Sequence, residues 1–353
     1  MTVAFPRQAT AGVTVHELVP GEEARWDAFV ATCPEATFFH RAGWKAALEQ
    51  GLGHRGRFLY AERDGAIEGV LPLGEVRSWL FGKALVSTPF CVYGGAAAIS
   101  GEARQALETA ACRLAEARGV DHLELRHRAP RHPDWPAKRD HYATFRKAID
   151  PDPEANYGRI RRKQRAEIRK GIQAGLRAEV DADVERFYPV YAESVRNLGT
   201  PVFPKRYLRT LKAVFGDDCE VLAIVDGERV VSGVMSFYFR DEVLPYYGGG
   251  TAAARGVSAN DFMYWELLRR AAEGGVGVFD FGRSKCDSGA YHFKRHWGFE
   301  PEPLHYEYRL VRGRAVPDVS PANPKYQALI ATWRRLPLPV TRTVGPWIAR
   351  SLG

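Results

Sequence analysis

The sequence predicts an α/β protein built from two tandem copies of one unit. Its 353 residues are more than one hydrophobic core usually organises, which favours two domains. The expected strands and helices also follow one another in the same order in both halves, about 160 residues apart. A composition of 45% hydrophobic and 26% charged residues is ordinary for a globular chain, so collagen-like, low-complexity and wholly disordered classes are excluded.

The first copy opens with a strand and two helices. Apolar residues at Ala103, Leu107, Ala111 and Leu114 have helical spacing and predict its longest helix. Its expected elements are strand 13–19, helices 22–31 and 41–50, strand-like runs 57–62, 66–73 and 85–97 (the last with a break), helix 102–118, and strands 120–125 and 142–149.

The second copy repeats this order. Its expected elements are strand 176–180, helices 184–196 and 205–215, strands 220–225, 229–239 and 243–247, helix 258–273, strand 278–281, a short helix, and strand 304–311. The predicted division of the chain is a tail at 1–12, a first domain at 13–150, a basic linker helix with the first strand of the second unit at 151–182, a second domain at 183–312, and a basic amphipathic tail at 313–353.

The two copies differ after the strands that end near residues 125 and 281. The second copy has Ser288 as an N-cap, a helical stretch to Trp297 and Gly298 just beyond its end. The first copy has Pro130, Pro133 and Pro136 in the same place, and prolines prevent a regular helix. We therefore expect 129–137 to be irregular and the chemistry to lie in the second half.

The net charge of +8 is concentrated in two segments. One is the basic strip at 159–177, which has a single acid, Glu167; the other lies at 312–350. We expect a helix over 159–174, with Ile160, Ile168 and Ile172 facing protein and Arg161, Arg165 and Arg169 facing a ligand. Concentrated basic charge favours a polyanionic partner such as RNA, a pyrophosphate or an anionic lipid surface, and a solvated basic helix is the alternative.

The densest group of chemically useful residues lies at 278–298. A buried strand ends in Gly282-Arg283-Ser284-Lys285, and ligands of open α/β sheets bind where strands end and helices begin. On the following helix Ala290, Phe293 and Trp297 share one face, which we expect to point inward, with Lys294 beside it at a cleft edge. An ammonium there could stabilise the oxyanion of an acyl-transfer intermediate; the alternative is a surface lysine. Asp280 could act as a base or cap the nearby loop.

Four segments carry a family resemblance. DFGRSKCDSGAYHFKRHWGF resembles the C-terminal signature of the Fem family of aminoacyl and acyl transferases, and is closest to the branch associated with exosortase and PEP-CTERM systems. Weaker matches are TFFHRAGWKAAL, RRKQRAEIRKG and VSANDFMYWELLRRA. The resemblance implies two tandem GNAT-like acyltransferase domains with mixed, mostly antiparallel sheets. The Fem pattern usually has Gln where this chain has His40, and the chain shows no coiled-coil arm.

The resemblance also implies an activity and site residues. We expect transfer of an aminoacyl or acyl group to an amine of a small or lipid-linked cell-envelope precursor, of peptidoglycan or exopolysaccharide type. Lys294 would stabilise the oxyanion, Phe293 would position it, and Asp280 is the third catalytic candidate. The expected substrate-binding residues are Arg283, Ser284, Tyr291, Tyr247, Asn260, Arg161 and Arg165 from the second half, with His40 and Trp44 of the first half holding the acceptor.

The donor has two alternatives, aminoacyl-tRNA and acyl-CoA, and no tightly bound cofactor is expected. The stretch 248–260 contains Arg255-Gly256, a fragment of the pyrophosphate-binding loop of acetyl-CoA enzymes, without its full spacing. This weakens CoA and leaves room for an aminoacyl-tRNA donor, whose backbone would suit the basic strip. A β-bulge or turn is the alternative reason for the glycines. His292 and His296 have a zinc-like i, i+4 spacing but lack a third ligand, so we expect no metal.

The compartment expected from the sequence is the cytoplasm. No secretory signal and no apolar run of 18 residues is visible, and the five scattered cysteines include no CxxC pair. The tail 313–353 mixes arginines with Trp333 and Trp347; docking on the core is favoured over contact with the inner face of the membrane. A non-catalytic RNA-binding or scaffold protein built on relic GNAT units is the alternative from a different class.

Overall fold

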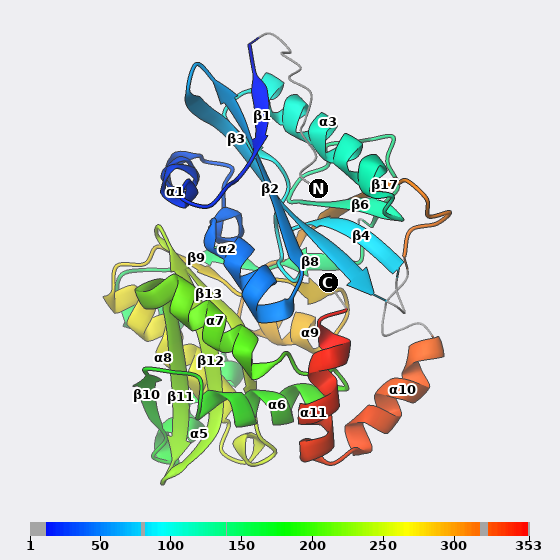
Figure 1. Ribbon diagram of the computed structural model, residues 1–353. Helices are drawn as coiled ribbons and strands as arrows, with labels where there is room; N and C mark the ends of the chain where they lie inside the picture. The colour runs from blue at the N-terminus through cyan, green and yellow to red at the C-terminus, as the bar shows by residue number, and fades with distance from the viewer. Residues whose placement is uncertain (1–11, 79–81, 139, 318–323, 352–353) are drawn as a thin grey trace. The chain divides into compact units, whose positions relative to one another are not determined.

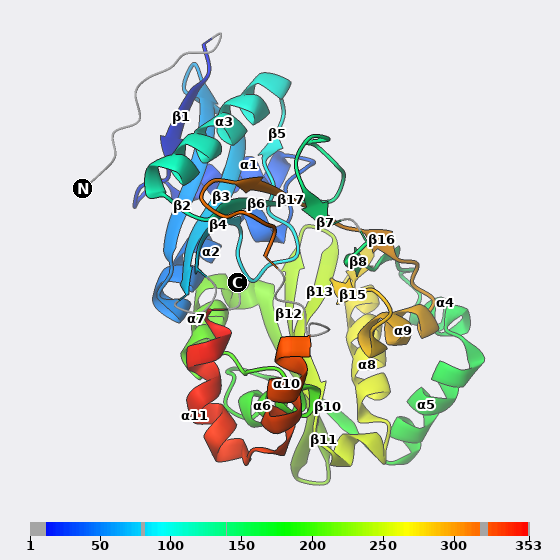
Figure 2. The same ribbon diagram turned by 90° about the vertical axis from the view of Figure 1, so that its right-hand side faces the viewer.

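The computed structural model describes residues 12–78, 82–138, 140–317 and 324–351, shown as ribbons in Figures 1 and 2. The chain forms two compact units. Among the described residues, unit 1 comprises residues up to 138, residues 304–317 and residue 351, and unit 2 comprises residues 140–303 and 324–350. The chain therefore passes from unit 1 to unit 2 and later returns.

Unit 1 is built on an eight-stranded sheet. Its order is β1 (Thr14–Glu17), β2 (Arg55–Arg63), β3 (Ala66–Ser78), β4 (Gly82–Ser87), β6 (His122–His127), β17 (His305–Leu310) and β7 (Ala137–Lys138), with β5 (Ala97–Ala98) beside β3. The pair β4 and β6 is parallel, and the other pairs are antiparallel. Its helices are α1 (Glu23–Thr32), η1 (Phe38–His40), α2 (Gly43–Ala46), the π-helical turn η2 (Ala47–Leu52) and α3 (Gly101–Arg118).

The core of unit 1 follows from the alternation of side chains along its strands. Leu59 and Leu71 pack with the apolar stripe of α3 in one cluster. Phe58, the neighbour of Leu59, points the other way and meets the ring of Trp26 on α1 at 5.4 Å. Both faces of the sheet are therefore covered by helices, and this explains the continuous apolar runs at 58–61 in β2 and 70–73 in β3.

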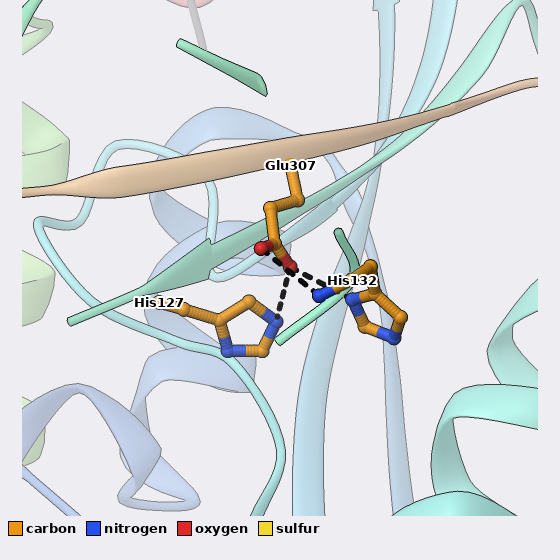
Figure 3. Close-up of side chains that lie close together, drawn as sticks. All are labelled: His127, His132 and Glu307. Carbon is orange, nitrogen blue, oxygen red and sulfur yellow. Dashed lines mark hydrogen bonds and ion pairs between the residues drawn. The ribbon is translucent and has the colours of Figure 1, made fainter. Parts of the chain in front are cut away.

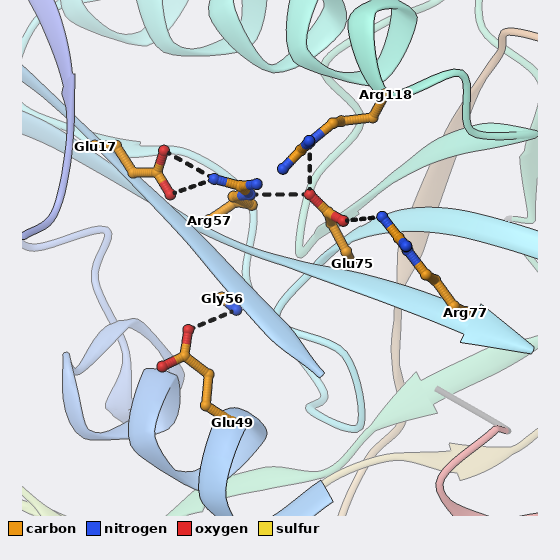
Figure 4. Close-up of polar contacts among 7 residues, drawn as sticks. All are labelled: Glu17, Glu49, Gly56, Arg57, Glu75, Arg77 and Arg118. Carbon is orange, nitrogen blue, oxygen red and sulfur yellow. Dashed lines mark hydrogen bonds and ion pairs between the residues drawn. The ribbon is translucent and has the colours of Figure 1, made fainter. Parts of the chain in front are cut away.

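A buried ion network ties this sheet to the end of α3 (Figure 4). The Arg57 side chain donates from Nη1 to Glu17 and from Nε to Glu75 Oε1 at 2.9 Å. Glu75 also meets Arg118 Nε at 2.8 Å and Arg77 Nη2 at 3.0 Å. Because Arg57 and Glu75 are both buried, their charges depend on these ion pairs for compensation.

Unit 2 repeats the strand plan of unit 1. Its six-stranded sheet has the order β10 (Arg177–Asp181), β11 (Cys219–Asp226), β12 (Arg229–Phe239), β13 (Glu242–Gly250), β14 (Val278–Asp280) and β9 (Arg146–Ala148). Here β13 and β14 are parallel, as β4 and β6 are in unit 1, and the other pairs are antiparallel. A small sheet of β15 (Ser284–Lys285), β8 (Tyr142–Thr144) and β16 (Glu302–Pro303) lies beyond. The predicted repeat and the predicted α/β class with mostly antiparallel sheets are confirmed.

The helices of unit 2 are α4 (Pro153–Arg159), α5 (Arg162–Gln173), α6 (Phe187–Leu198), α7 (Lys205–Phe215), η3 (Gly216–Asp218), η4 (Ala253–Arg255), α8 (Ala259–Glu273), α9 (Gly289–His296), α10 (Pro324–Arg335) and α11 (Leu338–Ala349). The expected basic helix over 159–174 is broken between α4 and α5. Ile160 and Ile168 are buried as expected, but the expectation for Ile172 is wrong: it is 52% exposed, because it lies in the last turn of α5.

One strand of each sheet comes from the other half of the chain. Strand β9 pairs with β14 in unit 2, and β17 pairs with β6 in unit 1. The expected boundaries, 13–150 and 183–312, assign these two strands the opposite way. Local patterning shows that 142–149 and 304–311 are extended, but the choice of partner strand is made by tertiary contacts.

The absence of a helix after β6 and the docking of the C-terminal tail both agree with expectation. Residues 128–136 contain no helix, in agreement with their three prolines. The C-terminal segment docks on unit 2: α10 and α11 contact α6, and Arg196 Nη1 donates to the carbonyl of Arg334 at 3.1 Å. The tail 1–12 lies almost wholly outside the described residues.

Candidate active site

The candidate site is built where β14 ends and α9 begins. The helix starts as the sequence predicts, because the Ser288 hydroxyl accepts a hydrogen bond from the amide of Tyr291 at 3.2 Å. It ends as predicted, with Gly298 in the left-handed region at φ 81°. These two caps fix the length of α9 and hence the position of Lys294 near its C-terminal end.

Lys294 is the buried residue of α9, only 9% exposed. Its Nζ donates to the carbonyls of Gly282 at 2.9 Å and Arg283 at 3.1 Å. The rings of Phe145 and Phe281 lie 5.5 Å and 6.0 Å from the same atom. Burial lowers the pKa of Lys294 from 10.5 to about 7, against the opposing effect of Asp280.

The predicted orientation of α9 is partly wrong. Trp297 is buried as expected, but Ala290 is exposed and Lys294 points inward rather than lying at a cleft edge. The indole of Trp297 donates to Asp261 on α8 at 3.2 Å, and this contact helps to fix the rotation of the helix. An aliphatic stem of four carbons makes Lys294 compatible with an apolar surrounding.

Asp280 holds the loop that faces Lys294. Its Oδ1 accepts from the amide of Gly282 at 2.7 Å and from the hydroxyl of Thr144 at 3.4 Å. Its Oδ2 lies 3.3 Å from Arg146 Nε, and Arg146 also pairs with Glu242. Asp280 thus caps the loop, which was the second of the two roles considered, and it sets the direction of the Gly282 carbonyl.

The residues next along the chain present polar groups at the same loop. Ser284 is buried, and its hydroxyl has no hydrogen-bond partner among the described residues. Arg283 is half-buried, with its guanidinium 4.5 Å from the centre of the Tyr142 ring. A buried hydroxyl without a protein partner is a suitable group for a substrate oxygen or nitrogen.

Two aromatic candidates line this region. Phe293 is half-buried and packs on Tyr264 and Phe281, with ring centroids at 5.6 Å and 6.4 Å. Tyr291 meets Phe145 edge-on at 5.2 Å. Phe293 therefore supports the helix face beside Lys294.

The structure adds residues that sequence reasoning missed. Thr144, Phe145 and Arg146 belong to the segment assigned to the first domain, yet they contact Asp280 and Lys294 in unit 2. Asp261 also links two elements, since its Oδ1 accepts from Trp297 and from Gln164 of α5 at 2.8 Å. Burial raises the pKa of Asp261. Its place in the first turn of α8 was the only signal of this role.

The helix α5 of the basic strip lies beside α8 (Figure 2). Its Gln164 donates to the Asp261 carboxylate of α8. Arg161 and Arg169 are exposed on α5, whereas Arg165 is half-buried with its guanidinium 6.0 Å from the Tyr157 ring. The two exposed side chains are available to a polyanion, and Arg165 is partly engaged in packing.

Tyr247 and Asn260 take structural contacts instead. The Tyr247 hydroxyl lies 3.0 Å from that of Tyr207, inside an aromatic cluster. The Asn260 Oδ1 accepts from the Ser232 hydroxyl at 2.7 Å.

The stretch 248–260 forms the end of β13, the turn η4 and the start of α8. Gly248–Gly250 are the end of β13, and a side chain at Gly249 would lie 2.2 Å from the Ser194 hydroxyl, so close packing explains the glycine. The amide of Ala252 donates to Glu193 at 2.8 Å, and Glu167 accepts from Ser258 at 2.6 Å. Carboxylates of α6 and α5 therefore accept hydrogen bonds from the loop before α8, and negative charge there disfavours an anionic pyrophosphate.

The expected acceptor role of His40 and Trp44 is wrong for this structure. His40 is buried, with Nε2 2.8 Å from the Gly95 carbonyl, and it belongs to the cap of η1. Trp44 is fully buried and donates to the Phe38 carbonyl at 3.1 Å. Both residues are core residues of unit 1, because the aromatic run at 38–44 folds back on itself.

Comparisons with known proteins agree with the fold. A family model described as an acetyltransferase (GNAT) domain matches residues 158–295. A crystal structure of FemX is similar with a TM-score of 0.64 at 14% identity, over 90% of this chain and 99% of that one. A tandem GNAT protein from the clavulanic acid biosynthesis pathway has a TM-score of 0.53 at 13% identity, over 86% and 100%. None of the curated proteins matches in sequence.

A third similar structure is the C-terminal domain of a putative lysylphosphatidylglycerol synthetase from Agrobacterium fabrum, with a TM-score of 0.56 at 13% identity, over 83% of this chain and 92% of that one. Fold and family model together define the class: the chain is an acyltransferase with tandem GNAT folds. Within that class, the matching family model is a GNAT domain, and the likeness to FemX is a likeness of fold. Among the described residues, no helix is both long and apolar enough to cross a membrane.

Proposed function

We propose that this acyltransferase moves an aminoacyl group onto an amine of a cell-envelope precursor, of peptidoglycan or exopolysaccharide type, in the manner of the exosortase-associated Fem branch that its C-terminal signature resembles. The observation that carries the proposal is the buried Lys294, held by two carbonyls at 2.9 Å and 3.1 Å. On the same strand–loop–helix segment, the buried Ser284 hydroxyl has no hydrogen-bond partner among the described residues.

The chemistry assigned to these residues is stabilisation of a tetrahedral intermediate. The acceptor amine attacks the acyl carbonyl, a C–N bond forms, and the carbonyl oxygen becomes an oxyanion. The Lys294 ammonium has three N–H groups, two of which are used by the carbonyls, so one remains to donate to that oxygen. The intermediate collapses with loss of the donor's alcohol or thiol, which takes up the proton released by the amine.

The donor we propose is an aminoacyl-tRNA, with acyl-CoA as the second candidate. The carboxylates of Glu193 and Glu167, which accept hydrogen bonds from the loop before α8, disfavour the pyrophosphate of CoA. The exposed arginines of α5 suit a phosphodiester backbone, and α5 and α9 share Asp261. A protein that only binds RNA would not need a buried lysine at position 294, so we favour an enzyme over simple RNA binding.

Peripheral contact with an anionic membrane surface forms part of the proposal. On α11 the side chains of Val340, Val344 and Trp347 remain exposed at i, i+4, i+7 spacing, so they share one face. The guanidinium of Arg350 lies 4.9 Å from the Trp347 ring. An apolar face edged by a cation suits the boundary between head groups and acyl chains, where a lipid-linked acceptor is held.

The deciding experiment incubates the purified chain with labelled aminoacyl-tRNA and, separately, with labelled acyl-CoAs, each with a mixture of lipid-linked envelope precursors. Transfer of label from aminoacyl-tRNA supports the proposal, and transfer from acyl-CoA alone replaces the donor. Absence of transfer from both donors overturns it. Sedimentation with anionic and neutral vesicles, using Trp347→Ala as the matched variant, tests membrane contact separately.

A further inference from the structure

Unit 1 contains a compact group of His and Glu side chains that the acyl-transfer proposal does not use. His127 ends β6, His132 lies in the irregular stretch that follows, and Glu307 lies in β17 (Figure 3). One ligand atom from each residue can be chosen so that all three lie within 4.8 Å of one another. The set is drawn from segments about 175 residues apart, so only the folded unit assembles it.

The two oxygens of Glu307 have separate tasks. Its Oε1 accepts from the amides of Arg131 at 2.8 Å and His132 at 3.1 Å. Its Oε2 is thereby directed between the imidazoles, 2.7 Å from His132 Nδ1 and 3.6 Å from His127 Nε2. A carboxylate oriented in this way offers one oxygen to a central ion.

The two imidazoles are also oriented from outside the group. His132 Nε2 lies 3.2 Å from Glu108 Oε2, and its ring stacks on Trp135 with centroids 4.1 Å apart. A carboxylate on the distal nitrogen of a histidine is the usual arrangement behind a metal-bound imidazole. His127 is 6% exposed, and its Nε2 has no hydrogen-bond partner among the described residues.

We propose that His127 Nε2, His132 Nδ1 and Glu307 Oε2 bind a divalent transition-metal ion of the zinc class. Two nitrogens and one carboxylate oxygen are a ligand set that Zn²⁺ accepts, with the fourth position left to water. Bonds of about 2.1 Å to a tetrahedral ion place neighbouring ligand atoms about 3.4 Å apart. The 3.6 Å contact already fits, and the 2.7 Å contact has to widen by about 0.7 Å.

The bound ion would stabilise the position of β17 in the sheet of unit 1. Strand β17 enters this sheet from the C-terminal half of the chain, and Glu307 is its residue in the group. Because the ligands are separated widely in sequence, the unfolded chain binds the ion weakly and binding favours the folded unit. The site lies in unit 1 and is independent of the transfer proposed for unit 2, so either proposal can fail without the other.

The test uses the full chain stripped with a chelator and then titrated with Zn²⁺ alone, and with Co²⁺ as a spectroscopic probe. We expect one tightly bound equivalent, intense visible absorption of four-coordinate Co²⁺, and a melting temperature that rises with Zn²⁺. Glu307→Gln keeps an oxygen for the two amides but removes the anionic ligand, and we expect at least tenfold weaker binding. His127→Gln should weaken binding similarly and leaves the Glu307 contacts to the amides in place.

The matched control is the double variant His292→Ala with His296→Ala, which removes the exposed i, i+4 pair on α9. It should bind Zn²⁺ as the wild type does. The proposal is overturned if the stripped wild type binds no equivalent, or if the control loses the site while His127→Gln keeps it. Should Glu307→Gln fail to fold, His127→Gln and the wild-type melting shift decide the question.

Discussion

The two units follow one strand plan and diverge after the strand that is parallel to its neighbour. Beyond β14, unit 2 forms a tight loop and the helix α9, which brings Lys294 back over the loop carbonyls. Beyond β6, unit 1 forms a proline-containing stretch without a helix, which brings His132 back over Glu307. In each case the strand received from the other half completes the group, through residues 144–146 in unit 2 and Glu307 in unit 1.

This difference shows that one position in a repeated scaffold can hold different chemistry. In both units, residues of the group come from the end of one strand and from the strand contributed by the other half of the chain. The segment that follows the strand end determines which further side chain joins the group. In unit 2 this segment is a helix, and it places the long side chain of Lys294 in the group. In unit 1 it is an irregular stretch, and it places there the imidazole of His132, whose Nε2 lies close to the Glu108 carboxylate. The following predictions test this contrast, in order of decreasing effect.

The largest effect is expected from Lys294→Met, which keeps the length and the apolar stem but removes the charge. Transfer should fall by about 10²- to 10³-fold, the usual loss for one oxyanion donor. Arg295→Met, on the exposed side of the same helix, is the control and should retain activity. The rate is measured with labelled donor, with circular dichroism to establish folding. A fully active Lys294→Met protein removes this residue from the mechanism.

In unit 1 the largest effect should be on stability. Glu75→Ala leaves Arg57 buried without its main partner and should lower the free energy of unfolding by about 3–5 kcal/mol. Arg77→Ala removes an exposed partner of the same carboxylate and should cost less than about 1 kcal/mol. Urea unfolding of both variants measures the difference. Equal losses for the two would show that the network in Figure 4 is not held together by burial.

The pH dependence of unit 2 follows from Lys294. Its pKa is lowered to about 7 in the folded chain, so above that pH the folded protein holds fewer protons than the unfolded one. Stability relative to Lys294→Met should therefore rise with pH between about 7 and 10.5. Turnover at saturating acceptor should fall as pH rises through about 7, because the ammonium is lost. A turnover that instead rises through that pH would assign Lys294 the role of a base.

The smallest effect is expected on the basic helix. Arg161→Ala and Arg169→Ala should each weaken tRNA binding several-fold and reduce the slope of log affinity against log salt by about 0.7 to 0.9. Arg229→Ala, an exposed arginine at the start of β12, is the control. Filter binding at several salt concentrations provides the slopes. If the control changes the slope as much as the α5 variants do, binding is a property of net charge and not of α5.

The sequence by itself determined the repeat, the caps of α9 and the irregular course of 129–137. These features depend on local signals: apolar periodicity, a serine N-cap, a glycine beyond the helix end and prolines, each of which acts within a few residues. The same signals located Lys294, Asp280 and Ser284 on one strand–loop–helix segment. They could not fix the rotation of α9, which depends on the bond from Trp297 to Asp261 on another helix.

Only the tertiary structure decided which sheets receive the strands β9 and β17. Extended segments at 142–149 and 304–311 have no local mark of their partner, since strand pairing is chosen by side chains far away in sequence. That choice brings Phe145 and Arg146 to Lys294 and Asp280, and Glu307 to His127 and His132. The fold of unit 1 also removes His40 and Trp44 from the set of binding residues. In the sequence they look exposed at a helix start, but both are buried in the folded unit.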